Sequence, residues 1–232
     1  IIPANSVAAE TGNDEGIFGF GTNGGRTAVT NLVSNAGVVA TDVAGVGTAR
    51  TYLAATQYGG DKGIFGFGEP AGGVASMTNL VSNTGVVATD VAGVGTARAN
   101  LAACSYGGDK GIFGYGTGPT NITNLVSNAG VVASDQAATT GTARNYLAAC
   151  EYGDDKGIFG YGLGAYTAVT NLVSNTGVVS SDVAGVGTAR NYLAACSYGG
   201  DKGIFGYGYG GASLHYSLTN LVSNTGVVSS DV

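Results

Sequence analysis

The segment Tyr106-Gly107-Gly108-Asp109-Lys110-Gly111-Ile112-Phe113-Gly114-Tyr115-Gly116 occurs in five recognisable copies along the 232-residue chain. The aspartate of each copy marks its position: Asp14, Asp61, Asp109, Asp155 and Asp201. Successive copies are therefore separated by 47, 48, 46 and 46 residues. A period in this range is typical of repeat arrays and β-propellers, in which each repeat is one small unit that packs on its neighbours. The chain is long enough for five such units to bury a substantial core.

Each repeat is expected to contain four short strands. In the second repeat they cover residues 53–58, 63–68, 78–83 and 86–90. Clusters of Gly and Asp follow the first strand, and Asn-Thr-Gly or Asn-Ala-Gly follows the third, which is typical of turns that need positive φ. A helical repeat is excluded because each interior glycine costs a helix about 1 kcal/mol. The repeats therefore predict an all-β fold.

The second strand of each repeat has two unlike faces. Side chains alternate along a strand, so Phe113 and Tyr115 point to one face while Gly114 leaves the other face bare. Glycine inside a strand often marks a place where another group approaches closely. We therefore expect the aromatic side chains of one repeat to fill the glycine slots of the next.

Composition and charge exclude several classes of partner. Only 10% of the residues are charged and the apolar fraction is 44%, whereas disorder needs the opposite balance. The net charge of −6, with 9 basic residues spread along the repeats, argues against nucleic acid and against anionic membrane surfaces. No apolar run approaches the roughly 18 residues of a membrane span, so no membrane insertion is expected. The first residues have no signal-peptide pattern.

Three cysteines, Cys104, Cys150 and Cys196, occupy one position of successive repeats. The odd number argues against a disulfide framework. Ala9 and Thr56 occupy the same position in the first two repeats, so a small packing site accounts for all five residues. No His or nearby second Cys accompanies any of the three, and we therefore expect no metal site and no cofactor.

The repeat also resembles a known family. The run Arg98-Ala99-Asn100-Leu101-Ala102-Ala103, the Gly-Gly-Asp-Lys-Gly-Ile-Phe-Gly-Tyr-Gly segment, a Leu-Val strand and a fourth strand before the next Arg resemble the kelch-type propeller repeat. This resemblance implies a single five-bladed β-propeller over residues 1–232, with four antiparallel strands per blade. The blades would cover about 1–46, 47–94, 95–140, 141–186 and 187–232. If the ring closes, Ile1 and Val232 lie close together.

Residues that recur once per repeat are expected to serve the repeat itself. An arginine precedes the first strand in four copies, and an aspartate ends the fourth strand in all five, which predicts an ion pair or a backbone contact at each blade junction. A ring of ligand-binding groups is the alternative. The residues assigned to this structural class are Arg50, Arg98, Arg144, Arg190, Phe18, Phe65, Phe113, Phe159 and Phe205.

The loops between the second and third strands are the segments that differ most among the copies. They cover residues 22–28, 69–77, 117–122, 163–169 and 209–218. Different loops on equal scaffold units are the usual arrangement for binding, although unconstrained loop length would give the same pattern. Loops rich in Tyr, Ser and Gly suit adaptable recognition. The candidate ligand-binding residues are Arg26, Tyr166, Tyr209, His215 and Tyr216.

No catalytic site is expected. The acids that break the repeat, Glu10, Glu69, Glu151 and Asp154, are scattered, and no Gly-x-Ser-x-Gly elbow, His-Glu-x-x-His motif or P-loop is present. The repeat array resembles tail-fibre and other virion proteins of marine bacteriophages, which implies a virion location. We therefore expect a non-enzymatic, lectin-like binding module that recognises a host surface glycan or protein. The alternatives are a structural, decoration or assembly role among other virion proteins, and an engineered symmetric scaffold; the sequence leaves the oligomeric state open.

Overall fold

A computed structural model describes residues 15–136, 141–211 and 213–232. This part of the chain contains strands and no helix, which confirms the all-β prediction. Four repeat units each form a three-stranded antiparallel sheet, and the first forms a two-stranded sheet. We number the units 1 to 5 in chain order. No helix in the described residues is long and apolar enough to cross a membrane.

The strand bounds repeat closely from unit to unit. Unit 1 has β1 (Gly16–Thr22) and β2 (Arg26–Val33); unit 2 has β4 (Ala54–Tyr58), β5 (Lys62–Gly66) and β7 (Thr78–Val81). Unit 3 has β8 (Ala102–Tyr106), β9 (Lys110–Gly114) and β10 (Thr123–Val126); unit 4 has β11 (Ala148–Tyr152), β12 (Lys156–Gly160) and β13 (Thr170–Val173). Unit 5 has β14 (Ala194–Tyr198), β15 (Lys202–Gly206) and β16 (Thr219–Val222), and β3 (Arg50–Thr51) pairs with β6 (Glu69–Pro70).

The four three-stranded sheets share one strand register, in which equivalent residues lie opposite each other. In unit 3, Cys104 lies opposite Ile112, and Leu125 lies opposite Ile112 on the other side. The turn between β8 and β9 begins with Gly107 at φ 62° and Gly108 at φ 75°. Glycine adopts this left-handed region without the penalty of a Cβ, so the Gly-Gly pair allows the tight reversal.

The expected fourth strand is not a regular strand. The segment after β7 makes only two isolated bridges to it, Val81 with Val87 and Thr78 with Val91. Between them the side chain of Asn79 donates to the carbonyl of Ala88 over 3.0 Å, so a side chain replaces the backbone partner that a continuous ladder would use. The sheets therefore have three strands where the sequence predicted four.

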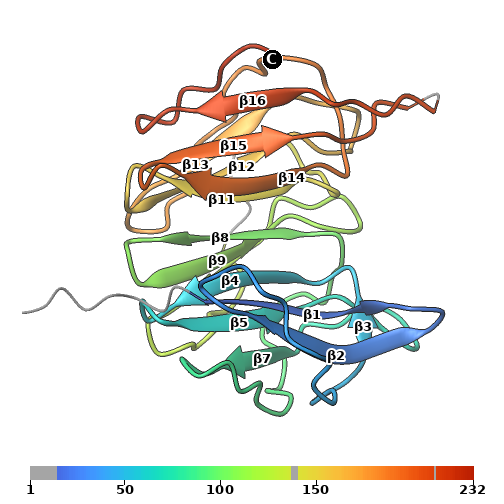
Figure 1. Ribbon diagram of the computed structural model, residues 1–232. Coiled ribbons are helices and arrows are strands. Elements are labelled where there is room, and N and C mark those ends of the chain that lie inside the picture. The colour runs from blue at the N-terminus through green and yellow to red at the C-terminus, as the bar shows by residue number, and fades with distance from the viewer. Residues whose placement is uncertain (1–14, 137–140, 212) are drawn as a thin grey trace, which may run out of the picture.

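Sheets pack face to face in chain order. Figure 1 shows unit 5 with β15 and β16 at the top, the strands β8 and β9 of unit 3 in the middle, and the strands of units 1 and 2 below them. Phe113 of unit 3 seats on Gly66 of unit 2, where an added Cβ would lie 2.6 Å from the ring. Its ring also meets Phe67 edge to face, with centroids 5.2 Å apart. The predicted packing of aromatic groups in glycine slots is confirmed, but each ring fills the slot of the preceding unit and not that of the next one.

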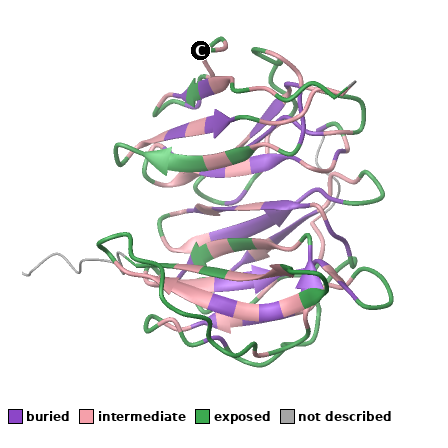
Figure 2. Cartoon of the chain, turned by 45° about the vertical axis from the view of Figure 1, so that its right-hand side comes forward, coloured by how far each residue is buried: buried purple, intermediate pink, exposed green. Residues whose placement is uncertain are grey.

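The middle sheets carry the core. The inner strand β8 alternates buried and half-buried residues, whereas the equivalent strand β14 in unit 5 is mostly exposed. Figure 2 shows this contrast between the middle sheets and the last one. No sheet in the described residues closes on itself, and a propeller is not confirmed. The first strand expected for repeat one (residues 6–11) and the chain start expected beside Val232 lie outside the described residues.

Candidate functional site

The repeated arginines lie inside the junctions between units. Arg98 is 1% exposed, and its guanidinium stacks over the Phe67 ring of the preceding unit at 4.2 Å. Its Nε donates to the Tyr115 carbonyl and its Nη2 to Asn124 Oδ1, each over 2.7 Å. Burial, opposed by the nearby charge of Asp135, lowers the pKa of Arg98 to about 10. Equivalent stacking holds Arg50, Arg144 and Arg190.

A carboxylate completes each arginine network. Asp135 accepts from the Thr96 hydroxyl over 2.7 Å and from Asn124 Nδ2 over 2.9 Å. Burial alone would raise the pKa of Asp135, but these hydrogen bonds outweigh it and lower the value below 3.8. Since Arg98 donates to Asn124 and Asn124 donates to Asp135, these polar groups are used within the protein, and the geometry gives them a structural role at the junction.

Two residues after each arginine, the chain presents a row of side chains at one edge of the stack. We call Tyr52, Asn100, Tyr146 and Tyr192 the tyrosine row. Their backbones are linked in order, because each N–H donates to the carbonyl of the preceding member over 2.9 to 3.0 Å. All four have φ between 51° and 55°. Non-glycine residues adopt this region only where the surroundings hold them there, so the row sits on a fixed frame.

The tyrosine row leaves aromatic surface open to solvent. Tyr52 is 56% exposed and Tyr192 is 59% exposed. The rings of Tyr146 and Tyr192 lie 4.2 Å apart between centroids. A hydrogen bond with the Tyr146 side chain and, to a smaller extent, burial raise the pKa of Tyr192 to about 12. Its phenol is therefore neutral at physiological pH and can donate a hydrogen bond.

The longest variable loop folds back beside this row. Tyr209 forms a bridge with His215, and their ring centroids are 5.4 Å apart. Tyr166 from the loop of unit 4 approaches Tyr209 with centroids 6.4 Å apart. An open pocket of about 530 Å³ results, which we call the tyrosine pocket; its lining residues are Tyr192, Tyr207, Gly208, Tyr209, His215 and Tyr216.

The structure thus brings together four of the five residues predicted to bind a ligand. Tyr209, His215 and Tyr216 line the tyrosine pocket, and Tyr166 lies beside it. Arg26 lies elsewhere, on β2 in unit 1, where its Nη2 pairs with Glu69 Oε1 of unit 2 over 2.8 Å. Its Nε also donates to the Glu69 carbonyl over 2.8 Å, so the guanidinium holds two adjacent units together.

Sequence reasoning missed Tyr146, Tyr192 and Tyr207. The first two follow an Arg-Asn pair and precede an inner strand, and repetition at this position indicated packing rather than exposure. Tyr207 is 63% exposed, although its equivalents Phe67, Tyr115 and Tyr161 are completely buried. Only the position of Tyr207 in the last unit explains this difference, and the local sequence carries no signal of it.

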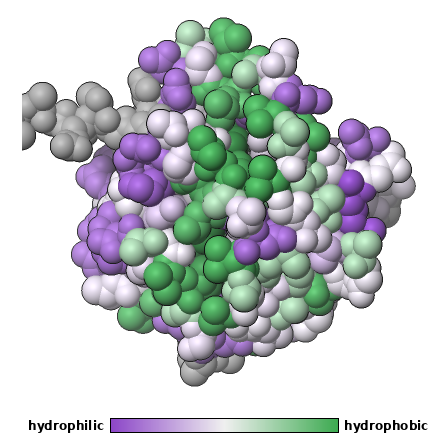
Figure 3. Space-filling view, turned by 90° about the horizontal axis from the view of Figure 1, so that it is seen from below, coloured by the Kyte–Doolittle hydropathy of each residue, from purple (hydrophilic) through white to green (hydrophobic). Residues whose placement is uncertain are grey.

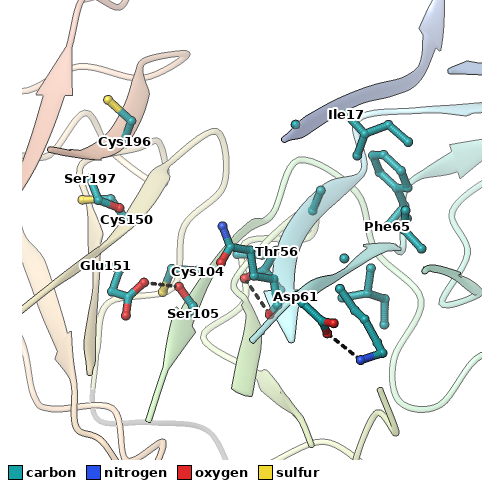
Figure 4. Close-up of a pocket in the computed structure, with 18 of the residues that line it drawn as sticks. Ile17, Thr56, Asp61, Phe65, Cys104, Ser105, Cys150, Glu151, Cys196 and Ser197 are labelled. Carbon is teal, nitrogen blue, oxygen red and sulfur yellow. Dashed lines mark hydrogen bonds and ion pairs between the residues drawn. The ribbon is translucent and has the colours of Figure 1, made fainter. Parts of the chain in front are cut away.

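A second cavity, of about 400 Å³, runs along the inner strands. Figure 4 shows its wall crossing the units from Ile17 through Thr56 to Cys196. In it the Ser105 hydroxyl donates to Glu151 Oε2 over 2.6 Å, and burial raises the pKa of Glu151. Small side chains such as Ala103, Ala149 and Ala195 line most of this groove.

Two of the cysteines beside the groove are buried between sheets, and Cys196 is exposed. Within the three described ranges, no group of at least three His, Cys, Asp or Glu residues is placed to hold a metal ion.

In comparisons with known proteins, no family model matches the chain and no curated protein matches it significantly.

Proposed function

We propose that the chain is a non-enzymatic binding module whose tyrosine pocket recognises a carbohydrate. The observation that supports this function is the gathering of exposed tyrosines from two different sequence positions, the tyrosine row and the last variable loop, in one open pocket. Exposed aromatic clusters on soluble proteins commonly mark binding sites. A volume of about 530 Å³ falls within the usual range for small-ligand sites.

The chemistry of the lining favours a neutral sugar. Its side chains are four tyrosines and one histidine, and no Asp, Glu, Lys or Arg is among the described lining residues. The face of an aromatic ring carries partial negative charge, which attracts the C–H groups of a pyranose ring. Tyrosine hydroxyls can then bond the sugar hydroxyls at the edge. Tyrosine also loses little conformational entropy on binding, since it has only two side-chain torsions.

The setting proposed for this activity is the surface of a phage virion, with a host glycan as ligand. It rests on the resemblance of the repeats to those of tail-fibre proteins. We also propose that the five units are kelch-like blades fanned around the groove. In units 2 to 5, the common register, the inner strand beside the groove and the Arg before that strand support this arrangement.

A glycan-array screen of the 232-residue chain tests the binding proposal. We expect saturable binding to a neutral glycan, lost in Tyr192→Ala and in a chain whose residues 209–218 are replaced by residues 117–122. Tyr198→Ala is the matched control, because Tyr198 is a 38% exposed tyrosine outside the tyrosine pocket. Binding that survives both changes would place recognition elsewhere, and the absence of any glycan ligand would refute the proposal.

A further inference from the structure

Adjacent units fit together through the same knob and socket at every junction. A phenylalanine of the later unit seats on a glycine of the earlier unit. A Cβ built on that glycine would lie 2.6 to 2.9 Å from the ring, which real Cβ atoms essentially never show. The pairs are Phe65 on Gly19, Phe113 on Gly66, Phe159 on Gly114 and Phe205 on Gly160. Each ring also meets the aromatic residue after that glycine, with centroids 5.1 to 5.3 Å apart.

The two end units carry the unpaired halves of this junction. Phe18 in unit 1 is 64% exposed, whereas Phe113 is completely buried. At Gly206 in unit 5, a built Cβ would meet only Thr219 of the same sheet, at an ordinary 3.5 Å. Tyr207, the aromatic residue after that glycine, is 63% exposed. Within the part of the chain that the structure describes, unit 1 therefore presents a knob without a socket, and unit 5 a socket without a knob.

A second contact runs in the opposite direction and is unpaired at the same ends. Inside the stack, a side chain of the earlier unit seats on a glycine of the later one: Thr56 on Gly111, Cys104 on Gly157 and Cys150 on Gly203. At the ends, Cys196 of unit 5 is exposed, and a Cβ on Gly16 of unit 1 would meet only Val33 of its own sheet.

A third contact follows the same rule. Leucines of the third strand pack on a turn glycine of the next unit, as Leu125 does on Gly177. Leu221 in unit 5 is 41% exposed, and nothing lies within 4 Å of the position that a Cβ on Gly37 in unit 1 would take. Figure 3 shows a band of hydrophobic residues, with hydrophilic residues to either side, across the face seen from the β2 and β7 side of Figure 1.

We propose that the chain associates head to tail with a second copy of itself. Phe18 of one copy seats on Gly206 of the other, while Cys196 and Leu221 of that other copy seat on Gly16 and Gly37. These contacts reproduce those inside each chain, where the ring and leucine contacts occur at four junctions and the Thr or Cys contact at three of them. Such a heterologous contact closes into a ring where the rotation allows and otherwise extends into longer chains of copies.

The geometry favours a second copy over closure within one chain. The four internal ring pairs differ by only 0.2 Å in centroid distance and 2° in interplanar angle. Each junction thus turns the chain by a similar amount, and among the described residues the last unit does not meet the first: a Cβ built on Gly206 contacts no residue of unit 1, and Phe18 is 64% exposed. Closing one chain on itself would change every close-packed junction, whereas a second copy changes none.

Sedimentation of the native chain over a range of concentrations tests this proposal. We expect the mass to rise from one copy to two or more. Gly206→Ala should weaken self-association about tenfold or more, because the added Cβ would overpack the contact with Phe18 of the other copy. The same change leaves the isolated chain folded, since the new Cβ has room there. Gly25→Ala is the matched control, because a Cβ at Gly25 would meet nothing within 4 Å.

Mixing two defective variants tests the direction of the contact. Phe18→Ala keeps the socket and loses the knob, whereas Gly206→Ala keeps the knob and blocks the socket. Each alone should stay monomeric at concentrations where an equimolar mixture associates. A native chain that stays monomeric overturns the proposal; if Gly206→Ala also lowers the stability of that monomer, the ends close within one chain. Association that Gly206→Ala leaves unchanged overturns it as well.

Discussion

Phe18 and Phe113 occupy the same place in the same Gly-Ile-Phe-Gly sequence, and we expect their removal to have very different costs. Phe113 is 0% exposed and fills the slot over Gly66, whereas Phe18 is 64% exposed. Truncating a buried phenylalanine usually costs about 3–5 kcal/mol, of which the transfer of the ring from water supplies about 1.5–3. The cavity and the lost edge-to-face contact with Phe67 supply the remainder.

The corresponding cost at Phe18 should be about 1 kcal/mol or less, because only roughly a third of that residue is covered in a single chain. Urea denaturation of Phe113→Ala and Phe18→Ala, followed by circular dichroism, measures both changes in the free energy of unfolding. The protein must be dilute enough to remain monomeric, since association would add burial at Phe18 alone.

Equal losses in the two variants would refute this reasoning. If both cost about 3 kcal/mol or more, Phe18 is buried in the single chain and the end of the stack is covered. If both cost little, packing between units does not carry the stability of the fold. The comparison is sharp because strand position and local sequence are the same, so secondary-structure propensity cancels.

Other parts of the repeat give further tests. Arg98→Met should cost about 2–5 kcal/mol in urea denaturation, because it leaves the buried Tyr115 carbonyl and the Asn124 amide oxygen without their donor; a loss below about 0.5 kcal/mol, as expected for Lys110→Ala, would contradict the network. Hydrogen bonds hold the pKa of four network carboxylates below 3.8. The ionised carboxylates therefore stabilise the fold above that pH, and this stability is lost as the pH falls through the lowered native pKa values. Melting temperatures measured from pH 5 to pH 2 should fall, and an unchanged melting temperature in that range would contradict the role of the carboxylates. The four are Asp90, Asp135, Asp182 and Asp231. Burial raises the pKa of the Cys150 thiol to about 12 and that of the Cys104 thiol well above 9.0. A thiol reagent should therefore modify only Cys196 in the dilute native chain, and all three cysteines after unfolding. Rapid reaction of all three thiols in the native state would rule out the packing described.

Period and alternation were sufficient to predict the strands that face another sheet. The Gly-Ile-Phe-Gly run shows its two faces in the residue types themselves, and the structure packs Phe113 into the slot at Gly66. The prediction of a regular fourth strand was wrong, although the local sequence, Val-Val-Ala-Thr-Asp, is compatible with a strand. What interrupts the ladder is the side chain of Asn79 from a neighbouring strand, a tertiary contact that no local pattern contains.

The candidate site divides in a similar way. Differences among the copies identified the loops that carry Tyr166, Tyr209 and His215, and the structure gathers them. The possible binding role of Tyr146 and Tyr192 was not predicted, because a residue found in most copies is expected to have a structural role in the repeat. Their exposure depends on a left-handed backbone conformation at one edge of the array. A glycine in the sequence indicates that positive φ is possible, whereas a tyrosine gives no such indication.

The unit that builds the interior of this molecule also determines what its ends can bind. A repeat that packs on its neighbour through Phe113 and Gly66 leaves half a junction exposed on each of the two outermost described units. In the described residues these are Phe18 and Gly206, and each costs the single chain an unpaired apolar surface. The tyrosine pocket lies at the same end as the open socket, since Tyr207 belongs to both. Head-to-tail association would therefore cover Tyr207, which also lines the pocket, while leaving Tyr192 and His215 outside the three matched contacts. Glycan binding must therefore be measured on chains dilute enough to remain monomeric.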